Sequence, residues 1–305
     1  MKIAGLEPLT LQDYPGEIAA VIFTAGCNLR CPYCHNPELV RTGFQLPSES
    51  NLHLENNLNQ ENNLNQGTDF CQKNDIDSET DLFPENDISH KNNMYQETDI
   101  CQETDLFPEY EILDFLKDRQ QYLDAVVISG GEPLIQPDLI EFSAQIKEMG
   151  YKIRLDTNGI LPLILQQLLN QELLDMVGWD YKLPRKRYQE LTLNQHQNQK
   201  IAAKIFQTGE LLSRSGIPLE IRTTAVPKLV TAEEVERIAR EISEHKFNPE
   251  LTTYVIQGFR NQRVLDQSFS KITPYSLEKL QEFKQVAEKH LADNNIADVI
   301  IRKNI

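Results

Sequence analysis

Short apolar runs alternate with longer amphipathic segments along most of this chain. Six runs have the length and apolar character of buried strands, at 17–23, 124–129, 151–156, 174–182, 217–226 and 250–257. Six segments repeat apolar residues at helical spacing, at 109–123, 136–150, 161–174, 200–216, 231–246 and 276–292. Because strands and helices alternate, the pattern predicts parallel strands joined by right-handed crossovers.

Several predicted helices have recognisable ends. Gly150 and Gly216 follow the last turns of two of them, where a glycine commonly ends a helix. Thr231 precedes another, and Glu234 stands at the capping-box position three residues later. Six strand–helix units form either an open (β/α)6 partial barrel or a doubly wound sheet, so the predicted fold class is α/β. In both architectures ligands bind at the C-terminal ends of the strands.

Residues 46–107 interrupt this rhythm between the first strand and its helix. The segment is rich in Asn, Gln, Asp and Glu, and it repeats itself: "ENNLNQ" begins at 55 and 61, and "ETDLFPE" at 79 and 103. A segment of this composition buries too little apolar surface to offset its ordering entropy. We therefore expect a disordered acidic insertion at 46–107, within one domain made of residues 1–45 and 108–305.

The formal charge of −16 belongs mostly to this insertion. Residues 46–107 contain 14 Asp and Glu against 2 Lys, which leaves a net charge of only −4 for the rest. The apolar runs are far shorter than the ~20 residues of a membrane span, and the first residues lack the apolar stretch of a signal peptide. We expect a cytoplasmic protein with no membrane or nucleic-acid partner.

Three of the five cysteines lie close together directly after the first strand, in "CNLRCPYCHN". A structural zinc site normally has four ligands in two pairs, and His35 would have to fold back sharply to complete one here. Cys27, Cys31 and Cys34 on a four-iron cluster would leave one iron without a protein ligand, available to another molecule. This Cx3CxxC spacing resembles the signature of the radical S-adenosylmethionine superfamily, whose members bind the methionine portion of that cofactor at the free iron.

The other two cysteines are not expected to bind metal. Cys71 and Cys101 lie 30 residues apart inside the acidic segment, without neighbouring Cys or His. We interpret them as free thiols without function.

Small and charged residues follow the next three strands: Gly130, Gly131, Glu132, Asp156, Asp180 and Lys182. The two glycines allow a backbone to approach a ligand closely, although a glycine turn alone is also common. Carboxylates at neighbouring strand ends favour the charged groups of S-adenosylmethionine, bound directly or through a monovalent cation, because oxygen-rich sites suit hard cations.

Taken together, these motifs resemble those of the glycyl-radical-enzyme activases, and most closely of anaerobic ribonucleoside-triphosphate reductase activating proteins. The resemblance rests on "CNLRCPYCHNPELV", "VVISGGEPLIQPDL", "IRLDTNG", "WDYKLP", "IRTTAVPKLVTAEEVERIA" and "YVIQGFRNQRVLDQSF". It implies a partial TIM barrel in which Cys27, Cys31 and Cys34 ligate a [4Fe–4S] cluster. It also implies that eight residues contact S-adenosylmethionine or its cation: Tyr33, Gly130, Gly131, Glu132, Asp156, Asp180, Lys182 and Arg222.

The activity implied by this resemblance is reductive cleavage of S-adenosylmethionine to a 5′-deoxyadenosyl radical, which installs a glycyl radical on a partner enzyme. The implied partners are an anaerobic ribonucleotide reductase and an electron donor such as flavodoxin or ferredoxin; no catalytic residue is expected beyond the cluster and cofactor. Two departures, "DYK" in place of "DLK" and Gln257 in place of a histidine, put the substrate protein in question. The alternatives are a radical enzyme acting on a small molecule, such as a 7-carboxy-7-deazaguanine synthase, and a non-catalytic scaffold.

Overall fold

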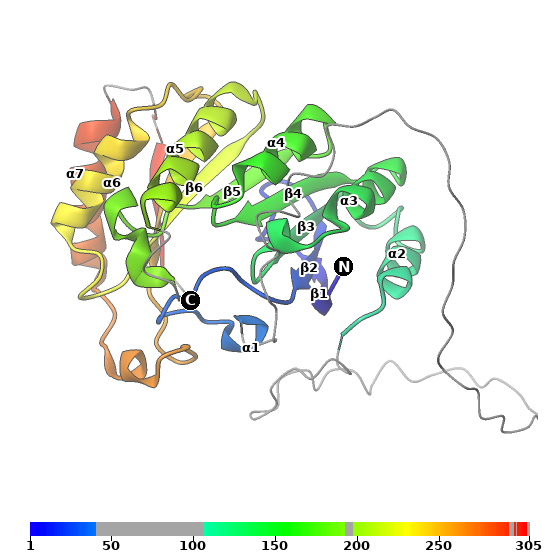
Figure 1. The fold of residues 1–305 in the computed structure, drawn as a ribbon, viewed down its shortest axis with the longest axis horizontal. Coiled ribbons are helices and arrows are strands. Elements are labelled where there is room, and N and C mark those ends of the chain that lie inside the picture. The colour runs from blue at the N-terminus through cyan, green and yellow to red at the C-terminus, as the bar shows by residue number, and fades with distance from the viewer. Residues whose placement is uncertain (41–105, 193–197, 293–295, 297, 304–305) are drawn as a thin grey trace, which may run out of the picture. The chain divides into compact units, whose positions relative to one another are not determined.

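One eight-stranded sheet forms the centre of the structure (Figure 1), a computed structural model that describes residues 1–40, 106–192, 198–292, 296 and 298–303. The strands are β1 (Ile3–Thr10), β2 (Ala19–Thr24), β3 (Ala125–Gly130), β4 (Lys152–Thr157), β5 (Met176–Asp180), β6 (Leu219–Ala225), β7 (Thr252–Gly258) and β8 (Asp298–Arg302). Their order in the sheet follows their order in the chain, and all neighbours are parallel except β1 and β2.

This strand order decides between the two predicted architectures. A doubly wound sheet reverses its strand order at a switch point, whereas a barrel adds each strand beside the previous one. No reversal occurs among the described strands, so the predicted partial barrel is confirmed. The six strands expected from the apolar runs correspond to β2–β7. Sequence analysis missed the two outermost strands, β1 and β8.

The described helices are α1 (Pro37–Val40), α2 (Glu109–Lys117), α3 (Leu139–Glu148), α4 (Pro162–Asn170), α5 (Asn198–Arg214), α6 (Ala232–Ile242) and α7 (Leu277–Leu291), with 3-10 helices η4 (Pro133–Ile135), η5 (Arg185–Leu191) and η7 (Gln267–Lys271). The six predicted helices correspond to α2–α7, whereas α1 and the three 3-10 helices were not predicted. Thr231 and Glu234 form the predicted capping box at the start of α6. Gly150 and Gly216 both adopt positive φ, as expected for residues that end helices.

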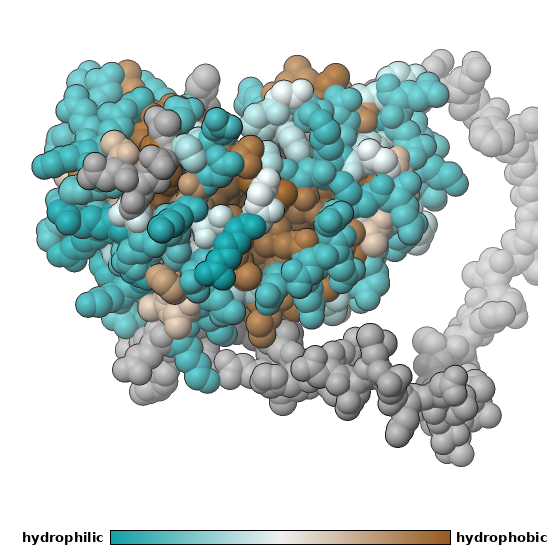
Figure 2. All heavy atoms as spheres, turned by 90° about the horizontal axis from the view of Figure 1, so that it is seen from above, coloured by the Kyte–Doolittle hydropathy of each residue, from teal (hydrophilic) through white to brown (hydrophobic). Residues whose placement is uncertain are grey.

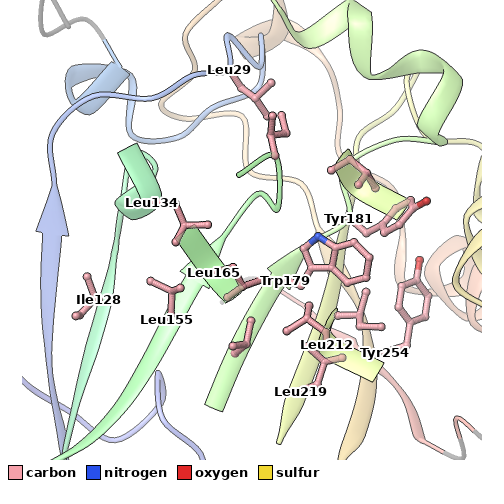
Figure 3. Close-up of a cluster of buried hydrophobic side chains, with 14 of the residues drawn as sticks. Leu29, Ile128, Leu134, Leu155, Leu165, Trp179, Tyr181, Leu212, Leu219 and Tyr254 are labelled. Atoms are coloured by element: carbon pink, nitrogen blue, oxygen red, sulfur yellow. The ribbon is translucent and has the colours of Figure 1, made fainter. Parts of the chain in front are cut away.

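The main core lies between the sheet and these helices (Figure 3). Ile128, Leu155 and Trp179 project from β3, β4 and β5 and are fully buried. Leu165 of α4 and Leu212 of α5 pack over them. Alternate residues of the same strands point to the opposite face of the sheet, where the charged side chains of the candidate site lie.

Polar side chains cover most of the face in Figure 2, with hydrophobic ones gathered near its middle. None of the described helices is both long enough and apolar enough to cross a membrane.

The predicted insertion at 46–107 lies outside the described residues up to position 105, and so do Cys71 and Cys101. Its last residue is described, and the Phe107 backbone N–H donates to the carbonyl of Ile3 at 2.8 Å. The domain boundaries at 45 and 108 remain a prediction.

Candidate functional site

The loop between β2 and α1 carries the three clustered cysteines. Gly26 starts it with a φ of 89° and donates its N–H to the carbonyl of Leu39 at 2.7 Å. Further along, the backbone of Arg30 donates to Leu191, and the carbonyl of Pro32 accepts from Asp266. These bonds fix the loop against the adjacent helix α1 and against two distant parts of the chain.

The thiols themselves sit in a poorly hydrated environment. Cys31 is buried, and Cys27 and Cys34 are half-buried. Burial, together with the charge of Glu132, raises the pKa of Cys27 to about 12, and burial raises the pKa of Cys31 to about 11. Such thiols release their protons readily only when positive charge binds to the sulfur, as iron does.

The donor set fits an iron–sulfur cluster. Among the described residues, no three His, Cys, Asp or Glu side chains converge closely enough to hold a single metal ion. A cluster instead takes each cysteine on a separate iron. The N–H of Leu29 already points at Cys27 Sγ, 3.4 Å away, and hydrogen bonds to sulfur are common around such clusters.

Lys182, directly after β5, brings a positive charge to the cysteines. Its ammonium donates to Asp180 Oδ2 at 3.2 Å. Burial opposes its charged form, but Asp180 and the Cys31 thiol outweigh burial and hold the pKa of Lys182 well above its usual range. The same charge favours ionisation of Cys31.

Tyr33 interacts electrostatically with Lys182 and Cys31. Its side chain is buried, and an ionised Cys31 would disfavour ionisation of the Tyr33 hydroxyl. Burial raises the pKa of Tyr33 well above its usual range. The structure therefore brings predicted residues from the first and fourth predicted strand ends together.

The two glycines after β3 pack against the cysteine loop. A Cβ atom on Gly131 would lie 1.8 Å from the carbonyl oxygen of Gly26, and one on Gly130 would lie 2.4 Å from the Thr24 nitrogen. The next residue, Glu132, donates its N–H to Gly26 at 2.9 Å. In this structure the glycines allow close packing between two loops, and their predicted contact with S-adenosylmethionine remains a prediction.

The Glu132 side chain is oriented by protein donors. Its carboxylate is 1% exposed and accepts from the backbone of Leu134 at 3.2 Å, the Thr157 hydroxyl at 2.7 Å and the Asn158 N–H at 2.8 Å. Burial raises the pKa of Glu132 to about 7 in spite of these bonds. The Asn158 side chain in turn donates to Asn28, between two cysteines, at 2.7 Å. Glu132 thereby links three strand ends.

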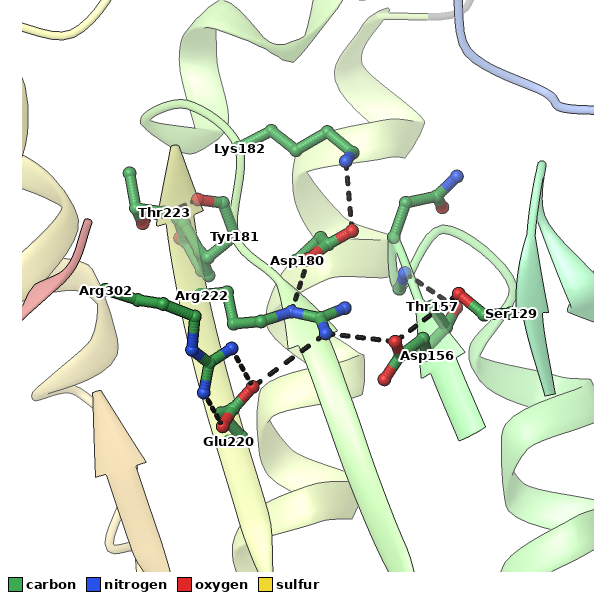
Figure 4. Close-up of polar contacts among 12 residues, drawn as sticks. Ser129, Asp156, Thr157, Asp180, Tyr181, Lys182, Glu220, Arg222, Thr223 and Arg302 are labelled. Atoms are coloured by element: carbon green, nitrogen blue, oxygen red, sulfur yellow. Dashed lines mark hydrogen bonds and ion pairs between the residues drawn. The ribbon is translucent and has the colours of Figure 1, made fainter. Parts of the chain in front are cut away.

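A layer of ion pairs joins β4, β5 and β6 (Figure 4); Arg154 and Glu220 in it are buried, and its other members are half-buried. Arg222 donates through Nε to Asp180 Oδ1 at 2.8 Å and through Nη1 to Asp156 Oδ2 at 3.0 Å. Burial opposes ionisation of Asp180, but Arg222 and Lys182 hold its pKa well below its usual range. The predicted convergence of Asp156, Asp180 and Lys182 is thus observed.

Sequence analysis did not identify the other half of this layer. Arg154 donates to Asp156 and to Glu220, both at 2.9 Å, and Arg302 of β8 makes two bonds to Glu220, of 3.0 and 2.7 Å. Arg154 and Glu220 precede Asp156 and Arg222 by two residues, so they share a face of the strand. The sequence signal that could have identified them is the occurrence of charged residues at alternate positions of otherwise apolar strands.

Comparison with known proteins supports the predicted superfamily independently of the cysteine motif. The family model of the Radical SAM superfamily matches residues 69–242, more than half of the chain. This match begins after the cysteine motif, so the two observations do not depend on one another.

Two curated proteins and one solved structure are similar to this chain. A Methanocaldococcus jannaschii protein with the provisional name of a glycyl-radical enzyme activating enzyme is 29% identical over 98% of this chain and 95% of its own length. The 7-carboxy-7-deazaguanine synthase of Methanopyrus kandleri is 28% identical over 56% of this chain and 52% of its own length. Streptococcus suis SuiB, solved bound to S-adenosylmethionine, is similar over 68% of this chain and 45% of its own, at 14% identity and a TM-score of 0.49.

The family match covers β3–β6, which carry the ion-pair layer, and the cysteine loop after β2 lies before it in the chain. The chain therefore belongs to the radical S-adenosylmethionine superfamily of enzymes, and this membership implies a [4Fe–4S] cluster and S-adenosylmethionine as cofactors.

Proposed function

We propose that this chain is a cytoplasmic activase that installs a glycyl radical on a partner enzyme. The observation that carries the proposal is the likeness to the M. jannaschii protein along almost the full length of both chains. The likeness to the deazaguanine synthase covers only about half of each chain and therefore favours that alternative less.

The cofactors supply the difficult chemistry: when bound, the cluster and S-adenosylmethionine provide a one-electron reductive cleavage that yields a 5′-deoxyadenosyl radical. Cys27, Cys31 and Cys34 would hold three irons of the cluster. The positive charge of Lys182 favours the anionic form of all three sulfurs.

The remaining predicted residues would bind and orient S-adenosylmethionine. Asp156, Asp180 and Arg222 hold one another in fixed positions at the ends of β4, β5 and β6, so the site is preorganised before the cofactor enters. Glu132 acts one layer further out, because it holds the ends of β3 and β4 against the cysteine loop.

The finer proposal is that the partner is an anaerobic ribonucleotide reductase and that flavodoxin or ferredoxin supplies the electron. The motifs named above support this choice. "DYK" and Gln257 are the positions at which the chain departs from pyruvate formate-lyase activases.

The test mixes anaerobically reconstituted protein with a candidate reductase, dithionite and S-adenosylmethionine. We expect a glycyl-radical signal in electron paramagnetic resonance, together with 5′-deoxyadenosine. Matched controls are the Cys31→Ala variant and a reductase whose radical glycine is replaced by alanine; neither should give the signal. Formation of 5′-deoxyadenosine without a glycyl radical on any candidate would favour a small-molecule substrate instead.

A further inference from the structure

Every carboxylate oxygen of Asp156 and Asp180 accepts a hydrogen bond from a positively charged side chain (Figure 4). Oδ1 of Asp156 accepts from Arg154 and its Oδ2 from Arg222. Oδ1 of Asp180 accepts from Arg222 and its Oδ2 from Lys182. An oxygen cage for a metal ion needs carboxylates whose charge is still uncompensated.

The charge balance of the whole layer also disfavours a metal ion. Among the described residues of this network, the carboxylates of Asp156, Asp180 and Glu220 meet four cations, namely Lys182, Arg154, Arg222 and Arg302. One positive charge is in excess. At this partly buried site a further cation would be repelled rather than attracted.

The fold makes room for the guanidinium between the two carboxylates. Gly178 lies on β5 between Asp156 of β4 and Glu220 of β6, and a Cβ atom there would lie 2.2 Å from Asp156 Oδ1 and 3.2 Å from Arg222 Cζ. The missing side chain leaves the space that Arg222 uses. The Arg222 side chain is only 12% exposed, so its position is fixed by packing as well as by charge.

We propose that Arg222 is the permanent cation of this site and that the Asp156–Asp180 pair binds no monovalent metal ion. A guanidinium is charged at every working pH and spans two carboxylates with its fixed fork of donors. It therefore neutralises the pair without a binding equilibrium, and S-adenosylmethionine binding does not depend on the potassium or sodium concentration. This proposal goes beyond glycyl-radical formation and holds whichever partner receives the radical.

The first test is thermal unfolding of the cluster-loaded full chain in potassium, sodium or choline chloride at equal ionic strength. Choline screens charge as the metal ions do but is too large to sit between two carboxylates. We expect the wild type to unfold at the same temperature in all three salts. In Arg222→Met, Asp156 Oδ2 and Asp180 Oδ1 lose their shared partner, and potassium or sodium should raise the unfolding temperature by about 2–4 °C over choline.

The matched control is Arg240→Met. Arg240 lies on α6, is 61% exposed and pairs with Glu236 one turn away, so this variant removes the same charge from the surface. It should respond to the three salts as the wild type does. If Arg222→Met does not fold, Arg222→Gln serves with the same expectation, because its amide carries no charge.

The second test is S-adenosylmethionine affinity, measured by equilibrium dialysis in the same salts. The wild-type dissociation constant should be equal in potassium and choline. In Arg222→Met it should rise about tenfold in choline, the loss of roughly one charge-assisted hydrogen bond, and recover partly in potassium. Potassium- or sodium-specific stabilisation of the wild type would overturn the proposal, and so would a folded Arg222→Met without any ion-specific response. Neither readout requires glycyl-radical formation, so failure of the proposed function would leave this result unaffected.

Discussion

The Thr157 hydroxyl donates to Glu132 Oε1 across 2.7 Å, and this bond ties the loop after β3 to the end of β4. Glu132→Gln preserves the shape but turns one accepting oxygen into a donor that faces Thr157 or the Asn158 N–H. A buried group that loses its partner costs about 1–3 kcal/mol. We expect a loss of that size in the free energy of unfolding, measured by urea denaturation. The exposed Glu148→Gln on α3 is the control; equal stability of both variants would contradict the role of Glu132.

Cluster assembly should require three cysteines and no others. Replacing Cys27, Cys31 or Cys34 with alanine removes one iron ligand, and we expect each variant to lose stable cluster after anaerobic reconstitution. Cys71→Ala and Cys101→Ala should bind as much iron and sulfide as the wild type. Iron and sulfide analysis with the visible absorption spectrum measures this. Iron loss from the Cys71 or Cys101 variant would refute the assignment of three ligands.

Gly178→Ala should disrupt the ion-pair layer. The new methyl group would lie 2.2 Å from Asp156 Oδ1 and 2.8 Å from Arg154 Nη2, so these side chains must move. Overpacking of this kind costs about 1–3 kcal/mol, and displacement of Asp156 should also weaken S-adenosylmethionine binding. Gly5→Ala is a matched control on β1, because its Cβ atom would make only an ordinary 3.5 Å contact with Phe23. If both variants bind the cofactor like the wild type, the layer does not position it.

Glu220 should make stability depend on pH in the acid range. Burial alone would raise its pKa, but hydrogen bonds from Arg302 and the charges of Arg154 and Arg222 lower it to about 2. A carboxylate with a depressed pKa stabilises the folded state above its unfolded pKa of roughly 4.3, and this contribution disappears as the pH falls toward 2.

The Glu220→Gln variant isolates this effect. Relative to the wild type, we expect it to lose on the order of 3 kcal/mol of unfolding free energy at pH 7, and the difference to shrink as the pH falls below about 4. Denaturant unfolding at several pH values measures it, with the exposed Glu141→Gln as control. A difference that stays constant down to pH 3 would show that Glu220 contributes packing rather than charge.

The segment at 46–107 should be replaceable by a short Gly/Ser linker. Leu39 is bonded to Gly26, Ala25 to Lys2, and Phe107 to Ile3, so hydrogen bonds hold both flanks at the same end of β1 and β2. The linker therefore joins two flanks that are held at the same end of these strands. We expect unchanged cluster content, 5′-deoxyadenosine formation and partner activation.

Each possible loss in the linker variant has a different meaning. Loss of the cluster would place the segment in the folded domain. Loss of partner activation alone would make it a docking arm for the partner enzyme.

Sequence periodicity predicted the six parallel strands and their helices because most positions of each strand are buried, which leaves short, mainly apolar runs between the amphipathic segments. β1 was missed because "IAGLEPLT" contains Gly and Pro and half of its residues are polar or exposed at the sheet edge. β8 was missed because five residues near the end of the chain, after a gap in the helical pattern, carry little periodic signal. An edge strand forms because it pairs with a neighbouring strand, and the local sequence pattern holds no information about that neighbour.

The sequence predicted those residues of the candidate site that belong to a recognisable motif. The cysteines and the charged residues at strand ends follow from spacing and from position after a strand. Arg154 and Glu220 lie inside strands, where a charge ordinarily argues against burial, and only the pairing of β4, β5 and β6 brings opposite charges within 2.9 Å. The role of Gly178 depends on its neighbours in the same way.

The hydrogen bond between Phe107 and Ile3 also has a consequence for sequence duplication in the segment before it. "ETDLFPE" occurs at 79 and again at 103, and the second copy ends with Phe107, Pro108 and the first residue of α2. A tandem duplication that copies this stretch always leaves one intact "LFPE" immediately before the helix, so the attachment to β1 is regenerated in the daughter sequence. We therefore expect such duplications to leave the folding of the barrel unchanged. Further duplications can therefore lengthen the segment before Phe107 without changing the positions of the residues around the cysteines.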